Sequence, residues 1–349
     1  MEKKREIYLD YLRIVSIFCV IGIHIVAKSW YNTPTKELSW QILNIYDSLF
    51  RFCVPIFIMI SGALFLNKDK KIEIKTLFKK NILRIFIALV FWSFIYAVFK
   101  NLITYKDINK FVLDKILNAF LMGHHHLWFL SAILGIYLAM PLLKKICEDR
   151  KLEKYLIILS FIHTSLIPFL MNLKIFDLIF NDTIFMLEIP LATGYVGYYL
   201  LGHYLNTYNI SNKKEKYIYI LGMCSLVFTI LITSLSSIKA LKPIDTYYEY
   251  LYANTYVLSV SIFILFKYRI SKIKISEKLK NKVVKLSNLV FGIYLVHEIF
   301  IIILDHYHFF KQNIMYSLLT PIFTVIIFIV SLLIVIIIKK IPMINKYII

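Results

Sequence analysis

Runs of about 20 apolar residues, separated by short charged segments, recur along the whole 349-residue chain. A helix needs about 20 residues to cross the roughly 30 Å hydrocarbon core of a bilayer, so each run is a candidate transmembrane helix. Apolar residues make up 59% of the sequence and charged residues only 18%, more apolar surface than a water-soluble domain can bury. The runs are continuous rather than alternating, which excludes a β-barrel. The sequence therefore predicts an all-α, polytopic membrane protein.

Charged and turn residues bound about ten such spans, and together they make residues 1–349 one helical membrane domain. The predicted spans are 7–30, 42–66, 82–104, 124–146, 152–171, 183–206, 216–237, 247–267, 286–306 and 315–338. The segment 105–123 places apolar residues at helical spacing with lysines between them, so we expect a short amphipathic helix on the outer surface there.

The formal net charge of +20 would suggest a nucleic-acid partner in a soluble protein, but here the charges lie between the spans. Loops on the amino-terminal side of the spans carry 28 lysines and arginines, against 8 in the opposite loops. By the positive-inside rule, both termini are cytoplasmic. We therefore expect a multi-pass protein of the cell membrane that contacts membrane lipid and binds no nucleic acid. The sequence leaves open whether it forms a homo-oligomer.

The first span, YLDYLRIVSIFCVIGIHIVAK, carries the densest set of ionisable residues. Arg13 and His24 are 11 residues apart, which places them on one helix face about 16 Å apart along the axis. Asp10 lies one turn before Arg13, and Lys28 one turn after His24. Ionisable groups within a membrane cost several kcal/mol unless they are paired or face a wet cavity, so this stripe predicts a functional site. The alternative is that Asp10 and Arg13 form a surface pair and His24 is a hydrogen-bonded core histidine.

The same stripe begins an ordered series of segments that resembles the acyltransferase-3 family of integral membrane O-acyltransferases. The series continues with VPIFIMISGALF (54–65), KKNILRI (79–85), HLWFLSAILGIYLAMPLL (126–143), GYYLLGHYL (197–205), YEYLYANTYVLSVSIFILF (248–266) and FGIYLVH (291–297). The chain looks most like the single-domain branch that modifies surface polysaccharides. The resemblance implies transfer of an acyl group, commonly acetyl, from cytoplasmic acyl-CoA to a hydroxyl of an extracytoplasmic cell-envelope glycan or lipid-linked sugar.

The resemblance also implies roles for Arg13 and Arg84 near the cytoplasmic third of the membrane and for His24 toward the outer third. Arg13 and Arg84, with Lys80, are expected to bind the phosphates of the donor, acetyl-CoA or another acyl-CoA, because guanidinium groups make charge-assisted bidentate bonds to phosphate. His24 is expected to act as the general base or to carry the acyl group itself, supported by Arg13 and Asp10.

Other candidate residues are expected to bind the acceptor: His126, Trp128 and Glu188 toward the outer side, and Tyr294 and His297 near mid-bilayer. Each has a structural alternative, such as an interfacial aromatic anchor for Trp128 or an ion pair with Arg51 or Lys28 for Glu188. We expect no metal, because consecutive histidines on a helix point about 100° apart and do not converge on an ion. The sequence assigns no role to Glu298.

Two other classes of function compete with the acyltransferase. A transporter or flippase of a lipid-linked saccharide would also have about ten spans with polar groups near the midplane, but the chain shows no internal repeat and few Gly or Pro interruptions. A membrane-anchored sensor or scaffold would not need an arginine and a histidine on one face of a buried helix.

Overall fold

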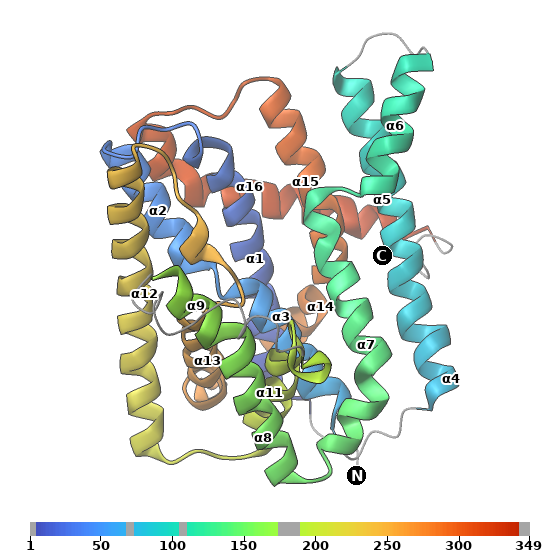
Figure 1. Cartoon of the computed structure of the whole chain (residues 1–349). Coiled ribbons are helices and arrows are strands. Elements are labelled where there is room, and N and C mark those ends of the chain that lie inside the picture. The colour runs from blue at the N-terminus through green and yellow to red at the C-terminus, as the bar shows by residue number, and fades with distance from the viewer. Residues whose placement is uncertain (1–4, 68–72, 105–109, 174–188, 342–349) are drawn as a thin grey trace.

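The computed structural model describes residues 5–67, 73–104, 110–173 and 189–341, which contain helices and no strand. Eight of the helical segments are long and apolar enough to cross a membrane, or nine if the bent pair Glu277–Ser287 and Val290–His306 is one span. The fold is therefore an all-α, polytopic helical bundle (Figure 1), as the apolar runs predicted.

The helical elements, with shorter 3-10 and π segments labelled η, have the following bounds. They are α1 (Ile7–Trp30), α2 (Leu38–Phe50), α3 (Cys53–Phe65), α4 (Ile74–Thr76), η1 (Leu77–Ile82), α5 (Leu83–Thr104), α6 (Lys110–Met122), η2 (His125–Leu127), α7 (Trp128–Ile146), α8 (Arg150–Ser160), η3 (Phe161–Leu166), α9 (Ile167–Asn172), η4 (Pro190–Ala192), α11 (Val196–Thr207), α12 (Asn212–Ala240), η5 (Thr246–Tyr248), α13 (Ala253–Tyr268), η6 (Ile270–Lys272), α14 (Glu277–Ser287), α15 (Val290–His306) and α16 (Ile314–Ile338).

The sixth predicted span, 183–206, is the one that falls short of a full crossing among the described residues. Helix α11 has 12 residues, or about 18 Å at 1.5 Å per residue, which is too short to cross the hydrocarbon core alone. The beginning of that span, 183–188, lies outside the described residues. The other nine predicted spans each correspond to a helix or a helix pair, and 7–30 matches α1 at both ends.

The short helix expected at 105–123 is present as α6, which begins at Lys110, while residues 105–109 lie outside the described residues; its place on the outer membrane surface stays a prediction. Helix α6 packs alongside α5, and the rings of Phe94 and Phe120 meet edge to face with centroids 6.1 Å apart. Figure 1 shows the two helices side by side at the top of the bundle, where α6 leads down towards α7. A helix with apolar residues at helical spacing can bury that face against a neighbouring helix as well as against lipid headgroups, and here the neighbour is α5.

Helix α1 lies at the centre of the bundle and contacts α2, α3, α13, α14, α15 and α16. Its amino-terminal end lies near the last turn of α16, because Arg5 and Lys339 both donate to Asn288, through its side-chain oxygen at 3.2 Å and its backbone carbonyl at 2.9 Å. At the opposite end of α1, Lys28 binds Asp305 at 2.8 Å. The beginning of α1 and the end of α16 therefore lie at one end of the bundle. That both termini are cytoplasmic stays a prediction.

Two glycines let α3 and α11 form the most extensive helix contact in the described structure. A Cβ atom placed on Gly62 would lie 1.8 Å from the backbone oxygen of Tyr199, and one on Gly202 would lie 1.9 Å from that of Met59. These distances leave no room for a methyl group. Small residues allow such close approach of helix backbones in membranes, where packing rather than the hydrophobic effect holds helices together.

The glycine contact yields a stability prediction. Gly62→Ala should force the α3 and α11 backbones apart, because the obstructing atom is a backbone oxygen that cannot rotate away. We expect a cost of about 1–3 kcal/mol or more, visible as a lower midpoint of thermal unfolding for the detergent-purified protein. Gly135→Ala is the matched control, since a Cβ there meets nothing within 4 Å. Equal midpoints for the two variants would contradict the proposed packing.

A second prediction concerns orientation. Single cysteines at Ser211 and Lys274 should resist an impermeant thiol reagent in intact cells, and one at Asn313 should react, because the more basic loops are expected in the cytoplasm. All three positions are exposed in the structure, so burial does not protect them. The protein without an added cysteine is the control for background labelling of the native cysteines, of which Cys224 is exposed. Labelling at Lys274 but not at Asn313 would invert the orientation.

Candidate active site

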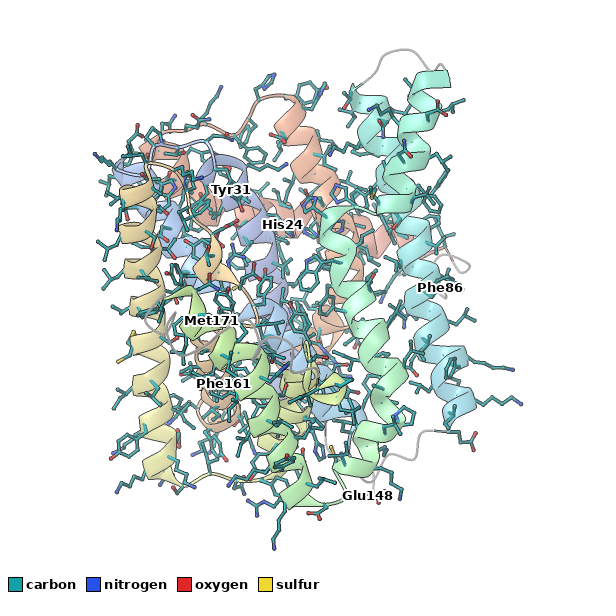
Figure 2. All side chains as sticks on the ribbon, in the orientation of Figure 1. His24, Tyr31, Phe86, Glu148, Phe161 and Met171 are labelled. Carbon is teal, nitrogen blue, oxygen red and sulfur yellow. The ribbon has the colours of Figure 1, made fainter. Side chains whose placement is uncertain are left out.

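Five of the nine histidines in the chain come together between α1, η2 and α15, and we call them, with Glu298, the histidine cluster. Its members are His24, His124, His125, His126, His297 and Glu298. Figure 2 places His24 on α1 inside the bundle, in the half nearer Tyr31 and away from Glu148. The cluster thus lies toward the end of α1 that is opposite its amino terminus.

An interruption of the helical backbone before α7 brings the consecutive histidines together. Gly123 has a positive φ of 71°, a conformation that glycine adopts without strain, and it follows the end of α6. His124 is extended, with φ −80° and ψ 139°, and a 3-10 turn begins at His125. The expectation that these histidines project from one regular helix and diverge is therefore wrong.

The ring of His24 is surrounded by other imidazoles. Its centroid lies 5.3 Å from that of His297, 5.5 Å from that of His125 and 6.3 Å from that of His126. The Nδ1 atom of His24 is 3.9 Å from Oε2 of Glu298, and Nε2 of His125 is 3.6 Å from the other carboxylate oxygen. One buried carboxylate is thus shared between two histidines.

Of the three histidines expected to act, His24 is the one that solvent reaches. Its side chain is 20% exposed, whereas His126 and His297 are 2% and 0% exposed. Nδ1 of His297 lies 2.7 Å from the backbone oxygen of Tyr294 and donates to it, since a carbonyl can only accept. Nδ1 of His126 pairs with that of His124 at 2.7 Å. His24 is therefore best placed to meet a substrate.

Three groups of side chains among the described residues have the ligand atoms that could hold a metal ion. Ligand atoms lie within 4.8 Å of one another in each of three sets: His24, His297 and Glu298; His124, His125 and Glu298; and Cys147, Glu153 and His203. The expectation that the protein uses no metal stays a prediction. Imidazole and carboxylate would suit zinc, but its ligands lie about 2.0–2.2 Å from the ion, so they would have to move closer together.

A cavity of about 360 Å³ opens on the amino-terminal side of the cluster, and we call it the basic cavity. Arg13, Lys80 and Arg84, predicted from separate segments of the sequence, all line it. Arg84 also lies over the ring of Phe291, with its guanidinium carbon 5.7 Å from the centroid. The apolar wall includes Phe57 and Phe129. The three cations are therefore gathered at one site.

Two irregular helix segments shape the wall of the basic cavity. Lys80 and Asn81 lie on the π-helix η1, and π segments interrupt helices frequently at functional sites. The 57° bend between α14 and α15 places Asn288, Val290 and Phe291 along the cavity. The first turn of α15 has no side-chain cap, so its backbone N–H groups remain available to an anion, as at other helix amino termini.

Asp10 has a different main partner from the one the sequence suggested. Arg5 donates to both of its carboxylate oxygens, at 2.8 and 2.6 Å, while Arg13 is 3.6 Å away. The hydrogen bond with Asp10 raises the pKa of Arg5 above its ordinary value. Asp10 and Arg5 line a second cavity of about 340 Å³, and Arg13 and Asn288 line both cavities. Arg13 is therefore not held in a close pair by Asp10 and faces both spaces.

Tyr294 links the basic cavity to the histidine cluster. Its side chain lines the cavity, its hydroxyl donates to the backbone oxygen of His126, and its ring centroid is 5.6 Å from that of His126 and 6.1 Å from that of His297. The site thus has two ends, with cations at one and imidazoles at the other.

Two predicted acceptor residues are not placed in the cluster. Trp128 packs against Tyr195 and Tyr250, with centroids 5.7 and 5.8 Å apart, rather than against a histidine ring. Glu188 lies outside the described residues. The two cations considered as its partners have other carboxylates: Arg51 binds Asp47 at 2.7 Å, and Lys28 binds Asp305.

A bundle of membrane-spanning helices that encloses arginines at one depth and histidines at another defines a polytopic membrane protein with a polar internal site. A comparison with protein families identifies the class. The family described as "Acyltransferase domain", the acyltransferase-3 family, matches residues 6–340. The match covers nearly the whole chain, so the chain belongs to this family and is a multi-pass membrane acyltransferase. Comparisons with curated proteins and with solved structures found no match.

The gathering of the three cations yields a binding prediction. Arg13→Lys and Arg84→Lys keep the charge but lose the planar fork that binds phosphate in two places. Hydrogen bonds to charged groups are worth about 1.5–3 kcal/mol, so acetyl-CoA affinity should fall about tenfold or more. Isothermal titration of the purified protein measures this. Arg150→Lys is the control, because Arg150 lies over the ring of Tyr208 and does not line the cavity. Unchanged affinity in both cavity variants would remove them from the donor site.

Proposed function

We propose that the protein transfers an acyl group, with acetyl as the first candidate, from acyl-CoA to a hydroxyl of a cell-envelope glycan or lipid-linked sugar on the opposite side of the membrane. The observation that carries the proposal is the two-ended site: the basic cavity leads to Tyr294, and Tyr294 contacts the histidine cluster. The family match supports the acyltransferase chemistry. The acyl group, the donor and the acceptor are the parts that the proposal adds.

The donor fits the basic cavity by charge and shape. The phosphates of CoA would meet Arg13 and Arg84, with Lys80 nearby and the uncapped first turn of α15 facing them. The aromatic walls would hold the apolar part of the pantetheine arm. In this placement the thioester lies toward Tyr294, at the inner end of the cavity. This arrangement requires the donor to enter from the end of the bundle that carries more lysine and arginine.

The acceptor would approach from the other end, where His125 is 60% exposed and His24 is partly so. A sugar hydroxyl is a weak nucleophile while it keeps its proton. His24 takes that proton as the hydroxyl oxygen attacks the thioester carbonyl carbon, forming the new C–O bond. The C–S bond then breaks, and the proton passes from His24 to the departing sulfur. The products are an ester of the acceptor and free CoA thiol, so no net proton is gained or lost.

A transporter or flippase of a lipid-linked saccharide is the competing function, and the structure gives a reason to prefer the acyltransferase. Transport needs a solvent-accessible polar path through the bundle. His126 and His297 would have to line that path, but both side chains are almost fully buried. A catalytic site needs contact between two substrates at one histidine, and His24 offers that contact. The family match favours the same answer.

His24 provides the test of the proposed chemistry. General-base assistance contributes about 10²–10⁴ in rate, so His24→Ala should abolish measurable acyl transfer while acetyl-CoA affinity stays within a few fold. His24→Gln separates chemistry from packing, because glutamine keeps the polar size but cannot take up the proton. The assay follows radiolabelled acetyl transfer into surface glycan by membranes containing the full-length protein.

His306→Gln serves as the matched control, because His306 is an exposed histidine at the end of α15, outside the cluster. It should transfer acetyl at the wild-type rate. A near wild-type rate in His24→Gln would make His24 a structural residue and leave His297 as the next candidate base.

A further inference from the structure

Glu298 differs from every other buried carboxylate among the described residues. Four of these have a basic partner at close distance: Asp10 with Arg5 at 2.6 Å, Asp47 with Arg51 at 2.7 Å, Glu153 with His203 at 2.7 Å, and Glu215 with Arg269 at 2.7 Å. Glu298 is 1% exposed, and its nearest basic atoms belong to His125 at 3.6 Å and His24 at 3.9 Å.

A carboxylate at this depth is costly unless it has a partner or a task. The four close pairs offset the cost through short charge-assisted bonds, but neither carboxylate oxygen of Glu298 comes within hydrogen-bond distance of its nearest basic atoms. Replacing Glu298 by an apolar residue would not leave a cation unpaired. Stabilisation of the fold therefore does not account for this carboxylate, and its position beside two imidazoles points to the reaction.

We propose that Glu298 is a positioning residue that holds His24 as the general base of acyl transfer, with His125 on its second oxygen. The inference rests on the proposed function. Oε2 faces Nδ1 of His24, so a carboxylate there favours the tautomer with a proton on Nδ1 and leaves the Nε2 lone pair free for the acceptor hydroxyl. It also stabilises the imidazolium that forms when that proton arrives. The 3.9 Å separation has to shorten by about 1 Å to form a hydrogen bond, as catalytic contacts often do when substrate binds.

The other histidines of the cluster are less suited to that task. His297 has Nδ1 bound to the carbonyl of Tyr294, and His126 has Nδ1 bound to His124, so neither presents Nδ1 to the carboxylate. His125 also lies beside Glu298, but its side chain is 60% exposed, so water can hydrogen-bond to its ring in place of the carboxylate. His24 combines the shared carboxylate with a partly enclosed ring.

The experiment compares Glu298→Gln with wild-type full-length protein, following release of free CoA from acetyl-CoA with water as the acceptor. The variant should lower kcat by about tenfold or more, a part of the roughly 10²–10⁴ that general-base catalysis supplies. Acetyl-CoA affinity should stay within twofold, because the donor phosphates lie at the other end of the site. Asp245→Asn is the matched control, because it removes an exposed carboxylate that binds Tyr31, outside the histidine cluster. Its kcat should match wild type.

A wild-type kcat in Glu298→Gln would overturn the inference, and so would a stoichiometric metal ion that is present in wild type and lost in the variant. If Glu298→Gln fails to fold, Glu298→Asp keeps the carboxyl group but withdraws it by one methylene. That variant should lower kcat while acetyl-CoA affinity stays within twofold, and full activity would assign Glu298 a structural role. The two proposals fail separately. An active His24→Gln variant would refute His24 as the general base. An inactive His24→Gln variant, together with a Glu298→Gln variant as active as wild type, would refute only the positioning role of Glu298.

Discussion

Arg13 and His24 lie on one face of α1 at depths where hydrocarbon would make a charge or an unpaired polar group expensive. The bundle resolves this by surrounding α1 with other helices, which bring polar partners to both depths. At one depth the result is the basic cavity, and at the other it is the histidine cluster. The arrangement of the other helices can be understood as the enclosure of this one polar stripe.

The enclosure depends on irregular backbone at a few positions. The bend between α14 and α15 brings Asn288 and the first turn of α15 to the basic cavity, and carries Tyr294, His297 and Glu298 upward to the cluster. Gly123 ends α6 so that the three consecutive histidines meet α1 and α15. The glycine contact of α3 and α11 sits beside this core and sets how closely the helices approach. One helix, α15, therefore contributes to both ends of the site.

The sequence predicted the fold class and nearly all the spans, because these follow from apolar run length. The common site of Arg13, Lys80 and Arg84 was expected only from the resemblance to the acyltransferase-3 family, since the three residues lie on different helical segments. It did not predict the partners in space. Asp10 binds Arg5, which lies just before the first residue of α1, so the periodicity within α1 does not encode the pair. Gly123 was the available signal that the histidines do not lie on one helix. Glu298 could not be interpreted without knowing that α1 and η2 each bring a histidine to it.

The central claim is that a donor held by Arg13 and Arg84 presents its thioester to His24 past Tyr294. A cryo-electron microscopy structure of the full-length protein with a non-hydrolysable thioether analogue of acetyl-CoA tests it most directly. The account predicts phosphates on both arginines, with the carbonyl carbon of the analogue close enough to His24 for a hydroxyl to lie between them, each at about 3 Å. Phosphates bound elsewhere, or an acyl group directed away from the histidine cluster, would contradict it.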